Sequence, residues 1–538
     1  MNSIELELMW SNLRSVVTEQ ARAMQRTAFS PVVREAGDLA YGLFDARARM
    51  IVQADTGTPG HINCLASCGT FLAEKFDGDL VPGDVLITND PWIGAGHNFD
   101  ITVFAPIFRN GRILGYVGST NHHTDIGGTG QGANAHDVHE EGLWIPPLKL
   151  YEGGKPNKVL FEMIRSNVRL PALIAGDLAA QVATCESGGI ALNELCDRYG
   201  LTDIEALSDA ILDYSERAMR DSVRRCPAGS WEGRVEFDIP GGEVVTLCAK
   251  VTFDTEAGEV LIDFAGSSGQ SPKGVNVVLN YTRAYSTFAI RSILNPELPN
   301  NLGSITPIKV TAPEGTIVNC RYPAPVAARH IVGMYVPMPI MNALHHVLPD
   351  RVIAPGPGAP FSMQVFGRQD TGENFVTSLT GLTGGMGARA TKPGLAVTFY
   401  PAGLGTIPVE VIEAECPVVF DRKEIRRGSG GVGNSRGGDG QIVQFHLETD
   451  TPWLLSAAPS SLNCPPQGIA GGGPGQAGVF RINDKAILAQ GKMRMNPADV
   501  VYLETPGGGG FGAVGQDQSN PEGEGKHVTA QTMRPAAE

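Results

Sequence analysis

Glycine is spread along the whole chain and is densest after about residue 380. The chain has 67 glycines and 37 prolines among 538 residues, well above the roughly 12% that these two residues make up in ordinary globular proteins. The glycines follow no collagen-like period, and 42% of the residues are hydrophobic, which is enough for a sizeable core. The sequence therefore predicts a folded protein with many tight turns, short strands and close backbone approaches.

The first part of the chain has the apolar spacing of helices. Apolar residues recur every three or four positions over 4–28, and the pattern ends before Pro31. A second helical tract covers about 159–225 in several pieces. Its last piece opens with Thr202–Glu205, which has the pattern of a capping box. Both tracts predict long helices that flank the residues between them.

From Trp231 onward, apolar and polar residues alternate as in strands, and helical spacing returns near 283–294 and 329–348. This mixture predicts the α+β fold class in a multi-domain chain. The predicted parts are a helical and β N-terminal α+β domain at 1–228, a central α+β domain at 229–400, a glycine-rich β domain at 401–515 and a disordered tail at 516–538.

The charge and the cysteines narrow the possible functions. The formal net charge is −15, which argues against binding nucleic acid or an anionic membrane, because either would need a basic surface. No apolar stretch approaches the roughly 18 residues of a membrane span, and the first residues lack the features of a signal peptide. The nine cysteines show no zinc-ribbon spacing. We therefore expect reduced thiols and a cytoplasmic protein.

Potential metal ligands are concentrated between residues 89 and 141. Five of the 11 histidines lie in this segment. It also contains two β-rich runs, 101–108 and 113–119, separated by Asn110–Gly111. An Asn-Gly pair between two such runs is the strongest short signal for a hairpin. The segment therefore predicts a β-hairpin with polar residues at its open end.

The position of the turn sets which residues face one another across this hairpin. The numbers of paired residues should sum to about 221, which places Asp100 opposite Asn121 and His122 near Phe99. His97 precedes Asp100 by one short turn and belongs to the same end. Two imidazoles and a carboxylate that lie this close suit a catalytic divalent metal site with open positions.

Other interpretations of the same residues stay open. His, Asp and Asn are also common in turns and caps. The pair His122–His123 could supply one buried, hydrogen-bonded imidazole and one exposed neighbour, or a general base that needs no metal. Gly127–Gly132 could present backbone N–H groups to a substrate oxyanion or form a plain turn. The glycine clusters after residue 380 are interpreted mainly as turns between short strands. The chain has no P-loop motif.

Several motifs, taken in order, resemble the hydantoinase B/oxoprolinase family over roughly residues 4–513. They are Thr88–Pro91, Gly96–Asp100, His122–Gly128 and Glu141–Pro147, with Arg34–Asp38 before them and Pro408–Glu413, Ser435–Gly438 and Thr505–Gly510 after them.

The resemblance implies a catalytic subunit that works with a separate ATP-binding subunit. Related chains look like subunits of ATP-dependent cyclic-amide hydrolases and of acetone or acetophenone carboxylases. The partner would be a hydantoinase A-type subunit that binds ATP, in a hetero-oligomer acting on a small cyclic amide. The implied cofactor is a divalent metal (Zn, Mn or Fe), and its implied ligands are Asp38, His97, Asp100 and His122.

The hypothesis that follows is an ATP-dependent cyclic-amide hydrolase. Asp125 is our candidate for the group that fixes the second nitrogen of His122 or acts as a general base, and Asp90 for a similar role. His139 could be a partner of the site or a surface residue. The alternatives are a ketone carboxylase subunit, which would use the same ligands, and a non-catalytic subunit that only binds its partner.

Overall fold

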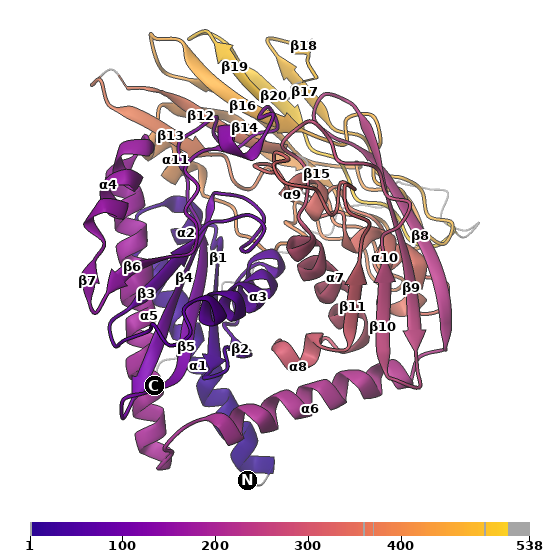
Figure 1. Cartoon of the computed structure of the whole chain (residues 1–538). Coiled ribbons are helices and arrows are strands. Elements are labelled where there is room, and N and C mark those ends of the chain that lie inside the picture. The colour runs from indigo at the N-terminus through magenta and orange to yellow at the C-terminus, as the bar shows by residue number, and fades with distance from the viewer. Residues whose placement is uncertain (1–2, 359–360, 370, 489–490, 515–538) are drawn as a thin grey trace, which may run out of the picture.

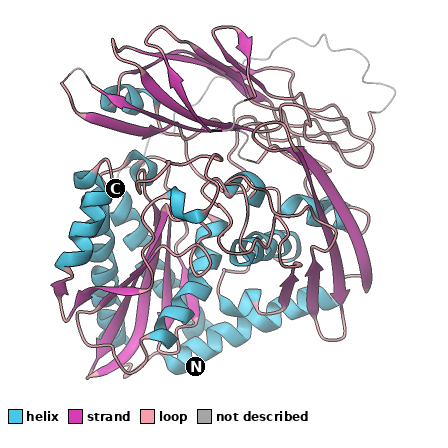
Figure 2. Cartoon of the chain, turned by 45° about the horizontal axis from the view of Figure 1, so that its top comes forward, coloured by secondary structure: helices cyan, strands magenta, loops and turns pink. Residues whose placement is uncertain are grey.

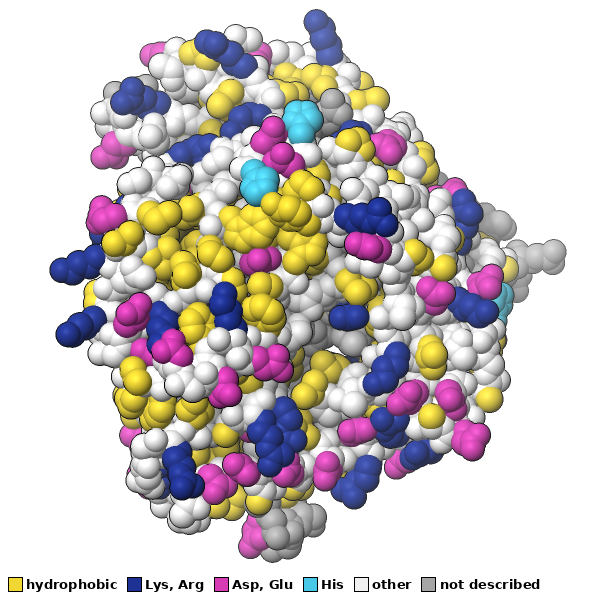
Figure 3. Space-filling model, in the orientation of Figure 1, with side chains coloured by type: hydrophobic (Ala, Val, Ile, Leu, Met, Phe, Trp, Pro, Cys, Tyr) yellow, Lys and Arg dark blue, Asp and Glu magenta, His cyan; other side chains and the backbone are white. Residues whose placement is uncertain are grey.

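The computed structural model describes residues 3–358, 361–369, 371–488 and 491–514, so the tail predicted at 516–538 lies outside the described residues. Helices and several separate sheets alternate along the chain (Figures 1 and 2), which confirms the predicted α+β class. No helix within the described ranges is both long and apolar enough to cross a membrane. Figure 3 shows acidic and basic side chains scattered over one face of the molecule rather than gathered by sign.

The N-terminal part is built on a seven-stranded sheet with the order β2-β1-β5-β4-β3-β6-β7, in which every pairing is antiparallel. Alternate side chains of its central strands are apolar, and both faces of the sheet are buried. The strands are β1 (Leu39–Asp45), β2 (Met50–Gln53), β3 (Val85–Thr88), β4 (Asp100–Arg109), β5 (Arg112–His122), β6 (Leu148–Glu152) and β7 (Lys155–Pro156).

Helices cover both faces of this sheet, and their bounds confirm the two predicted helical tracts. Helices α1 and α5 share one apolar core with the sheet, and α3 packs on its other face, between the sheet and α7 (Figure 1). The elements are α1 (Ser3–Thr27), α2 (Pro31–Arg34), α3 (Pro59–Lys75), the 3₁₀ helix η1 (Val138–Glu141), α4 (Lys158–Asn167), α5 (Pro171–Tyr199) and α6 (Glu205–Arg224).

The capping box predicted for α6 does not form. The N-cap residue is Ile204, which has no capping side chain. The Asp203 carboxylate instead accepts a hydrogen bond from the Glu205 N–H at 3.0 Å. The helix therefore begins two residues later than the pattern places it, because a buried isoleucine, 1% exposed, occupies the cap position.

The predicted hairpin is present as β4 and β5, and its turn has the expected chemistry. Asn110 and Gly111 both have positive φ, 50° and 74°, as a type I′ turn requires. The register is shifted by one residue from the prediction, because Leu114 forms a bulge after Ile113 pairs with Phe108. Asp100 therefore lies opposite His122, and not opposite Asn121 as predicted.

The central part is a four-stranded sheet, β11-β10-β9-β8, whose inner face packs against α7 and α10 in the largest apolar core of the molecule. This confirms the predicted strands after Trp231 and the predicted return of helices. The elements are β8 (Gly229–Asp238), β9 (Val244–Asp254), β10 (Glu259–Asp263), α7 (Leu279–Leu294), α8 (Leu302–Ile305), β11 (Ile308–Thr311), α9 (His330–Gly333), α10 (Pro337–Leu344) and η2 (Pro349–Arg351).

The C-terminal part consists of two sheets that share one apolar core (Figure 2). Their strand orders are β13-β12-β16-β19 and β14-β15-β20-β17-β18. The elements are β12 (Phe361–Arg368), β13 (Asn374–Ser378), α11 (Val409–Glu415), β14 (Val418–Arg426), β15 (Gly440–Leu447), β16 (Trp453–Pro459), β17 (Val479–Ile482), β18 (Lys485–Ala486), β19 (Gly491–Met495) and β20 (Val501–Glu504).

The glycine clusters are not mainly turns between strands, and that prediction was wrong. Four extended segments near 384–394, 428–438, 468–475 and 506–512 lie side by side and exchange backbone hydrogen bonds, such as Gly508 N–H to Gly438 O at 3.0 Å. The segments approach so closely that a Cβ would lie within 2 Å of a neighbouring carbonyl oxygen at several positions. Only glycine fits between these backbones.

Candidate metal centre

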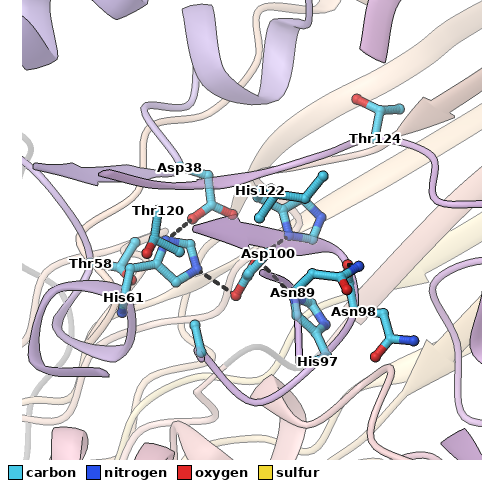
Figure 4. Close-up of polar contacts among 12 residues, drawn as sticks. Asp38, Thr58, His61, Asn89, His97, Asn98, Asp100, Thr120, His122 and Thr124 are labelled. Atoms are coloured by element: carbon cyan, nitrogen blue, oxygen red, sulfur yellow. Dashed lines mark hydrogen bonds and ion pairs between the residues drawn. The ribbon is translucent and has the colours of Figure 1, made fainter. Parts of the chain in front are cut away.

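The hairpin brings His97, Asp100 and His122 together at its open end (Figure 4). Asp100 begins β4 and His122 ends β5, so strand pairing alone places them side by side. The Asp100 Oδ1 atom lies 2.9 Å from both His97 Nε2 and His122 Nδ1. The three side chains offer ligand atoms that all lie within 4.8 Å of one another, and each residue is buried. The predicted gathering of these three residues is therefore present.

The orientation of His97 fits a metal ligand. Its Nδ1 lies 2.9 Å from the Ala327 carbonyl oxygen, and because a carbonyl can only accept, this nitrogen carries the proton. The other nitrogen, Nε2, then faces Asp100 Oδ1 with a lone pair, and it is buried without a hydrogen-bond partner. Two ligands of one ion with bond lengths of about 2.1 Å are about 3.0–3.4 Å apart, close to the distance observed here.

The charge states also suit a divalent cation. Burial lowers the pKa of His97 to about 4, so its imidazole is neutral at neutral pH, which is the form that binds metals. Burial alone would raise the pKa of Asp100, but His61, His97 and Arg329 hold it well below its usual range. Imidazole nitrogens together with an ionised carboxylate are a donor set that Zn, Mn and Fe accept.

His61 joins this cluster and was not among the predicted ligands. It lies in the first turn of α3, where the Thr58 side chain caps the helix by accepting from the His61 N–H at 3.2 Å. Its Nε2 lies 2.9 Å from Asp100 Oδ2, and its Nδ1 lies 3.4 Å from Asp38 Oδ1. Asp38, the implied fourth ligand, is therefore separated from Asp100 by one imidazole (Figure 4). The Thr58-Pro59 helix start was the signal in the sequence that could have placed His61 here.

Arg329 supplies a positive charge from the central part of the chain. Its guanidinium pairs with Asp100 Oδ2, and its Nε donates to the Ala95 carbonyl at 2.6 Å. It also lies over the Tyr281 ring, 4.1 Å from the centroid. Arg329 is 3% exposed, and Asp100 is fully buried. The carboxylate at the centre of the cluster is thus balanced by a buried arginine that is 229 residues away in the sequence.

The structure does not bring Asp125 to the histidines. Its Oδ1 accepts from Arg169 at 2.7 Å and from the Gly127 N–H at 3.1 Å, and its Oδ2 accepts from backbone N–H groups at the start of α5. Among the described residues Asp125 has no hydrogen bond to His122, because both of its carboxylate oxygens are taken by Arg169, Gly127 and Leu170. The carboxylate of Asp125 instead ties the loop after β5 to α5.

Asp90 also serves a turn. Its Oδ1 accepts from the Trp92 N–H at 2.9 Å, and burial raises its pKa. His139 lies at the surface, where its Nε2 is 2.9 Å from the Tyr322 hydroxyl and its ring packs on Trp144. His123 is fully buried like its neighbour, so the interpretation that placed one histidine of this pair at the surface was wrong.

A pocket with a free volume of about 80 Å³ opens onto the cluster, and all three parts of the chain line it. Asp38, His61, His97, His122 and Arg329 are among its polar lining residues. Many of the other lining residues are apolar, among them Tyr281, Tyr285, Met334, Phe361, Met363, Leu382 and Phe399. Such a combination of a few polar groups with an apolar lining is typical of a site for a small organic molecule.

A sequence model described as Hydantoinase B/oxoprolinase matches residues 2–514. The chain is 29% identical to the B-type component of a putative D-/L-hydantoinase of Pseudomonas sp. (strain NS671), over 95% of this chain and 90% of that protein. The ATP-dependent caprolactamase from Pseudomonas jessenii has a similar fold, with a TM-score of 0.84, 24% identity and coverage of 95% and 91%. The nucleotide-free structure of acetone carboxylase also has a similar fold, with a TM-score of 0.86 and 18% identity, over 95% of this chain and 75% of that chain.

Proposed function

The chain belongs to the hydantoinase B/oxoprolinase family, and from this premise we propose that it is the metal-bearing catalytic subunit of an ATP-dependent cyclic-amide hydrolase. The substrate would be a hydantoin, a lactam or an oxoproline-like ring. The observation that carries the proposal is the buried group of His97, Asp100 and His122, in which His97 Nε2 has no hydrogen-bond partner and faces a carboxylate.

The residues of the cluster divide the work of holding a cation and a substrate. His97, Asp100 and His122 would hold Zn, Mn or Fe, with Asp38 as a further carboxylate in the same pocket. A divalent ion supplies a Lewis acid that polarises a carbonyl or phosphoryl oxygen. The Ala327 carbonyl keeps the proton of His97 on Nδ1, and this leaves Nε2 free to bind.

Activation of the amide would come from the partner. A planar amide resists attack by water because resonance lowers its electrophilicity, and ATP can phosphorylate the amide oxygen to remove this protection. A hydantoinase A-type subunit would carry out this step, which agrees with the absence of a P-loop motif in this sequence and with the relative whose name makes it one component of a hydantoinase. Water would then add to the activated carbon, and the ring would open as the carbon–nitrogen bond breaks and the nitrogen takes up a proton. The acyl phosphate that this leaves would be hydrolysed by a second water, so that the products are the ring-opened carboxylic acid, ADP and inorganic phosphate.

The apolar residues of the pocket would have a role in this reaction. Tyr281, Phe361 and Met363 line the same pocket as the polar cluster. They would hold the ring of the substrate and limit the number of water molecules near the activated carbon, which protects a labile phosphorylated compound from loss before it reacts.

A second candidate is a subunit of an ATP-dependent ketone carboxylase. The fold shared with acetone carboxylase over 95% of this chain favours it, and the same ligands would serve either reaction. In that case the activated species would be an enol phosphate, and bicarbonate would supply the carbon that is added.

The test is to purify the chain together with the product of a neighbouring gene for an ATP-binding subunit. ATP turnover is then measured against hydantoins, lactams and ketones, with and without bicarbonate, and metal content is measured on the same samples. We expect about one Zn, Mn or Fe per chain and ATP turnover with a cyclic amide. His97→Ala should lose both, whereas the control His136→Ala should lose neither, because the His136 side chain is 83% exposed.

Each outcome separates the alternatives. ATP use that requires both a ketone and bicarbonate would replace the hydrolase with the carboxylase. A wild-type protein without stoichiometric metal, in which His97→Ala changes nothing, would leave only a non-catalytic role in partner binding.

A further inference from the structure

One short loop, residues 326–329, holds two residues of the metal cluster from behind. The Ala327 carbonyl oxygen lies 2.9 Å from His97 Nδ1, and the Arg329 guanidinium pairs with Asp100. A displacement of this loop would therefore change the orientation of one histidine and remove the counter-charge of the carboxylate at the same time. The position of the loop is a condition for the geometry of the site.

Glu141, the last residue of η1, fixes this loop. Its Oε1 accepts hydrogen bonds from the N–H groups of Val326 at 2.6 Å and Ala327 at 2.7 Å. The residue is fully buried. Two hydrogen bonds from consecutive amides to a single oxygen define where the Ala327 peptide lies, and so where its carbonyl meets His97.

We propose that Glu141 is a positioning residue of the metal centre, which sets the orientation of His97 and the place of Arg329 through the loop 326–329. It touches neither the proposed metal ligands nor the pocket wall, so it acts through the loop alone. This inference rests on the metal site proposed above, but it concerns a residue to which the proposed reaction gives no part.

The state of the Glu141 side chain supports this role. Its second oxygen, Oε2, is buried and has no hydrogen-bond partner among the described residues. Burial raises the pKa of Glu141 to about 8, so the side chain is neutral at neutral pH, with the proton on Oε2 and the carbonyl oxygen facing the two amides. A neutral acceptor holds the loop without adding a negative charge that would compete for the cation.

The chain provides a matched control in Asp238. This residue is also buried, 1% exposed, and its carboxylate also fixes a loop by accepting from consecutive backbone amides, those of Leu462, Asn463 and Cys464, at 2.8 to 3.0 Å. Its loop contains no residue of the metal cluster. Replacing Asp238 thus removes the same kind of carboxylate–amide hydrogen bonds from a loop that is not part of the metal cluster.

The experiment measures cobalt(II) binding by the full-length apo-protein, from the visible absorbance of bound Co²⁺, together with hydrogen exchange of the backbone. We expect Glu141→Ala to raise the Kd for Co²⁺ about 10- to 100-fold and to speed amide exchange at 326–329. Glu141→Gln keeps a neutral acceptor oxygen and should stay within about threefold of the wild-type Kd. Asp238→Ala should leave the Kd unchanged although it also lowers the melting temperature.

The readouts separate this inference from the proposed function. Wild-type protein that binds no Co²⁺ would overturn the metal site, while exchange at 326–329 would still decide whether Glu141 holds the loop. Wild-type protein that binds Co²⁺ and a Glu141→Ala variant that binds it equally well would overturn the inference alone. If Glu141→Ala does not fold, the isosteric variant Glu141→Gln tests the inference instead. A loss of Co²⁺ binding in this variant would refute the role of Glu141 as a neutral hydrogen-bond acceptor for the loop.

Discussion

Replacing Glu141 with glutamine should make the stability of the protein less dependent on pH. The pKa of this carboxyl is raised from 4.5 in a model compound to about 8 in the folded protein, mainly by burial, with Asp137 and Glu140 adding to the effect. Between these two values the folded chain keeps a proton that the unfolded chain releases. The wild-type protein therefore loses stability as the pH rises from about 4.5 to about 8.

The size of this loss follows from the shift. Each pH unit within the interval costs about 1.4 kcal/mol, so the change from pH 5.5 to pH 7.5 removes about 3 kcal/mol of stability. Glutamine at this position has no proton to release, so the stability of the variant does not fall with pH for this reason. With an unfolding entropy of about 2 cal/mol/K per residue, 1 kcal/mol corresponds to about 1 °C in a chain of this length.

The assay is thermal unfolding of the metal-free wild-type and Glu141→Gln proteins at pH 5.5 and pH 7.5. We expect the melting temperature of the variant, relative to wild type, to be about 3 °C higher at pH 7.5 than at pH 5.5. Glu152→Gln is the control, because this glutamate on β6 is exposed and should show no such gain. An equal difference between Glu141→Gln and wild type at both pH values would refute a neutral buried Glu141.

Three further perturbations test other parts of the structure. Asp100→Asn removes the charge that balances the buried Arg329, so the free energy of unfolding measured by chemical denaturation should fall by about 3–5 kcal/mol. An unchanged denaturation midpoint would contradict this pairing. Gly385→Ala would place a Cβ 1.8 Å from a backbone oxygen, whereas Gly269→Ala meets no atom within 4 Å, so only the first should abolish soluble expression, and equal yields would refute the close packing. Gly111→Ala forces alanine to a φ of 74° and should cost about 1 kcal/mol, measured as a lower melting temperature; no decrease would contradict the turn type.

Local signals in the sequence predicted much of the fold and the centre of the site. The Asn110–Gly111 turn needs only two residues to be recognised, and it was enough to place His97, Asp100 and His122 at one end of a hairpin. The bulge at Leu114 was not predictable in this way, because an extra residue in a strand has no fixed sequence pattern. The register was therefore wrong by one position, although the gathered residues were the same.

The rest of the site depends on contacts between distant segments. Arg329 reaches Asp100 across 229 residues, and no periodicity or motif in either segment predicts that contact. Asp125 was assigned to His122 because a metal-binding histidine needs a partner for its other nitrogen, but the turn after β5 directs the Asp125 carboxylate toward Arg169. The prediction that the glycine clusters are turns was wrong for a related reason, because the segments that pack against each cluster are other glycine segments far along the chain.

The pocket at the metal cluster has walls from the beginning, the middle and the end of the chain. A fragment that ends near residue 228 would contain the three gathered ligands and yet lack the carbonyl that orients His97, the arginine that neutralises Asp100 and the aromatic residues that line the same pocket. Metal binding is thus a property of the complete fold, and a half-synthesised chain emerging from the ribosome would not yet have a site able to bind the ion.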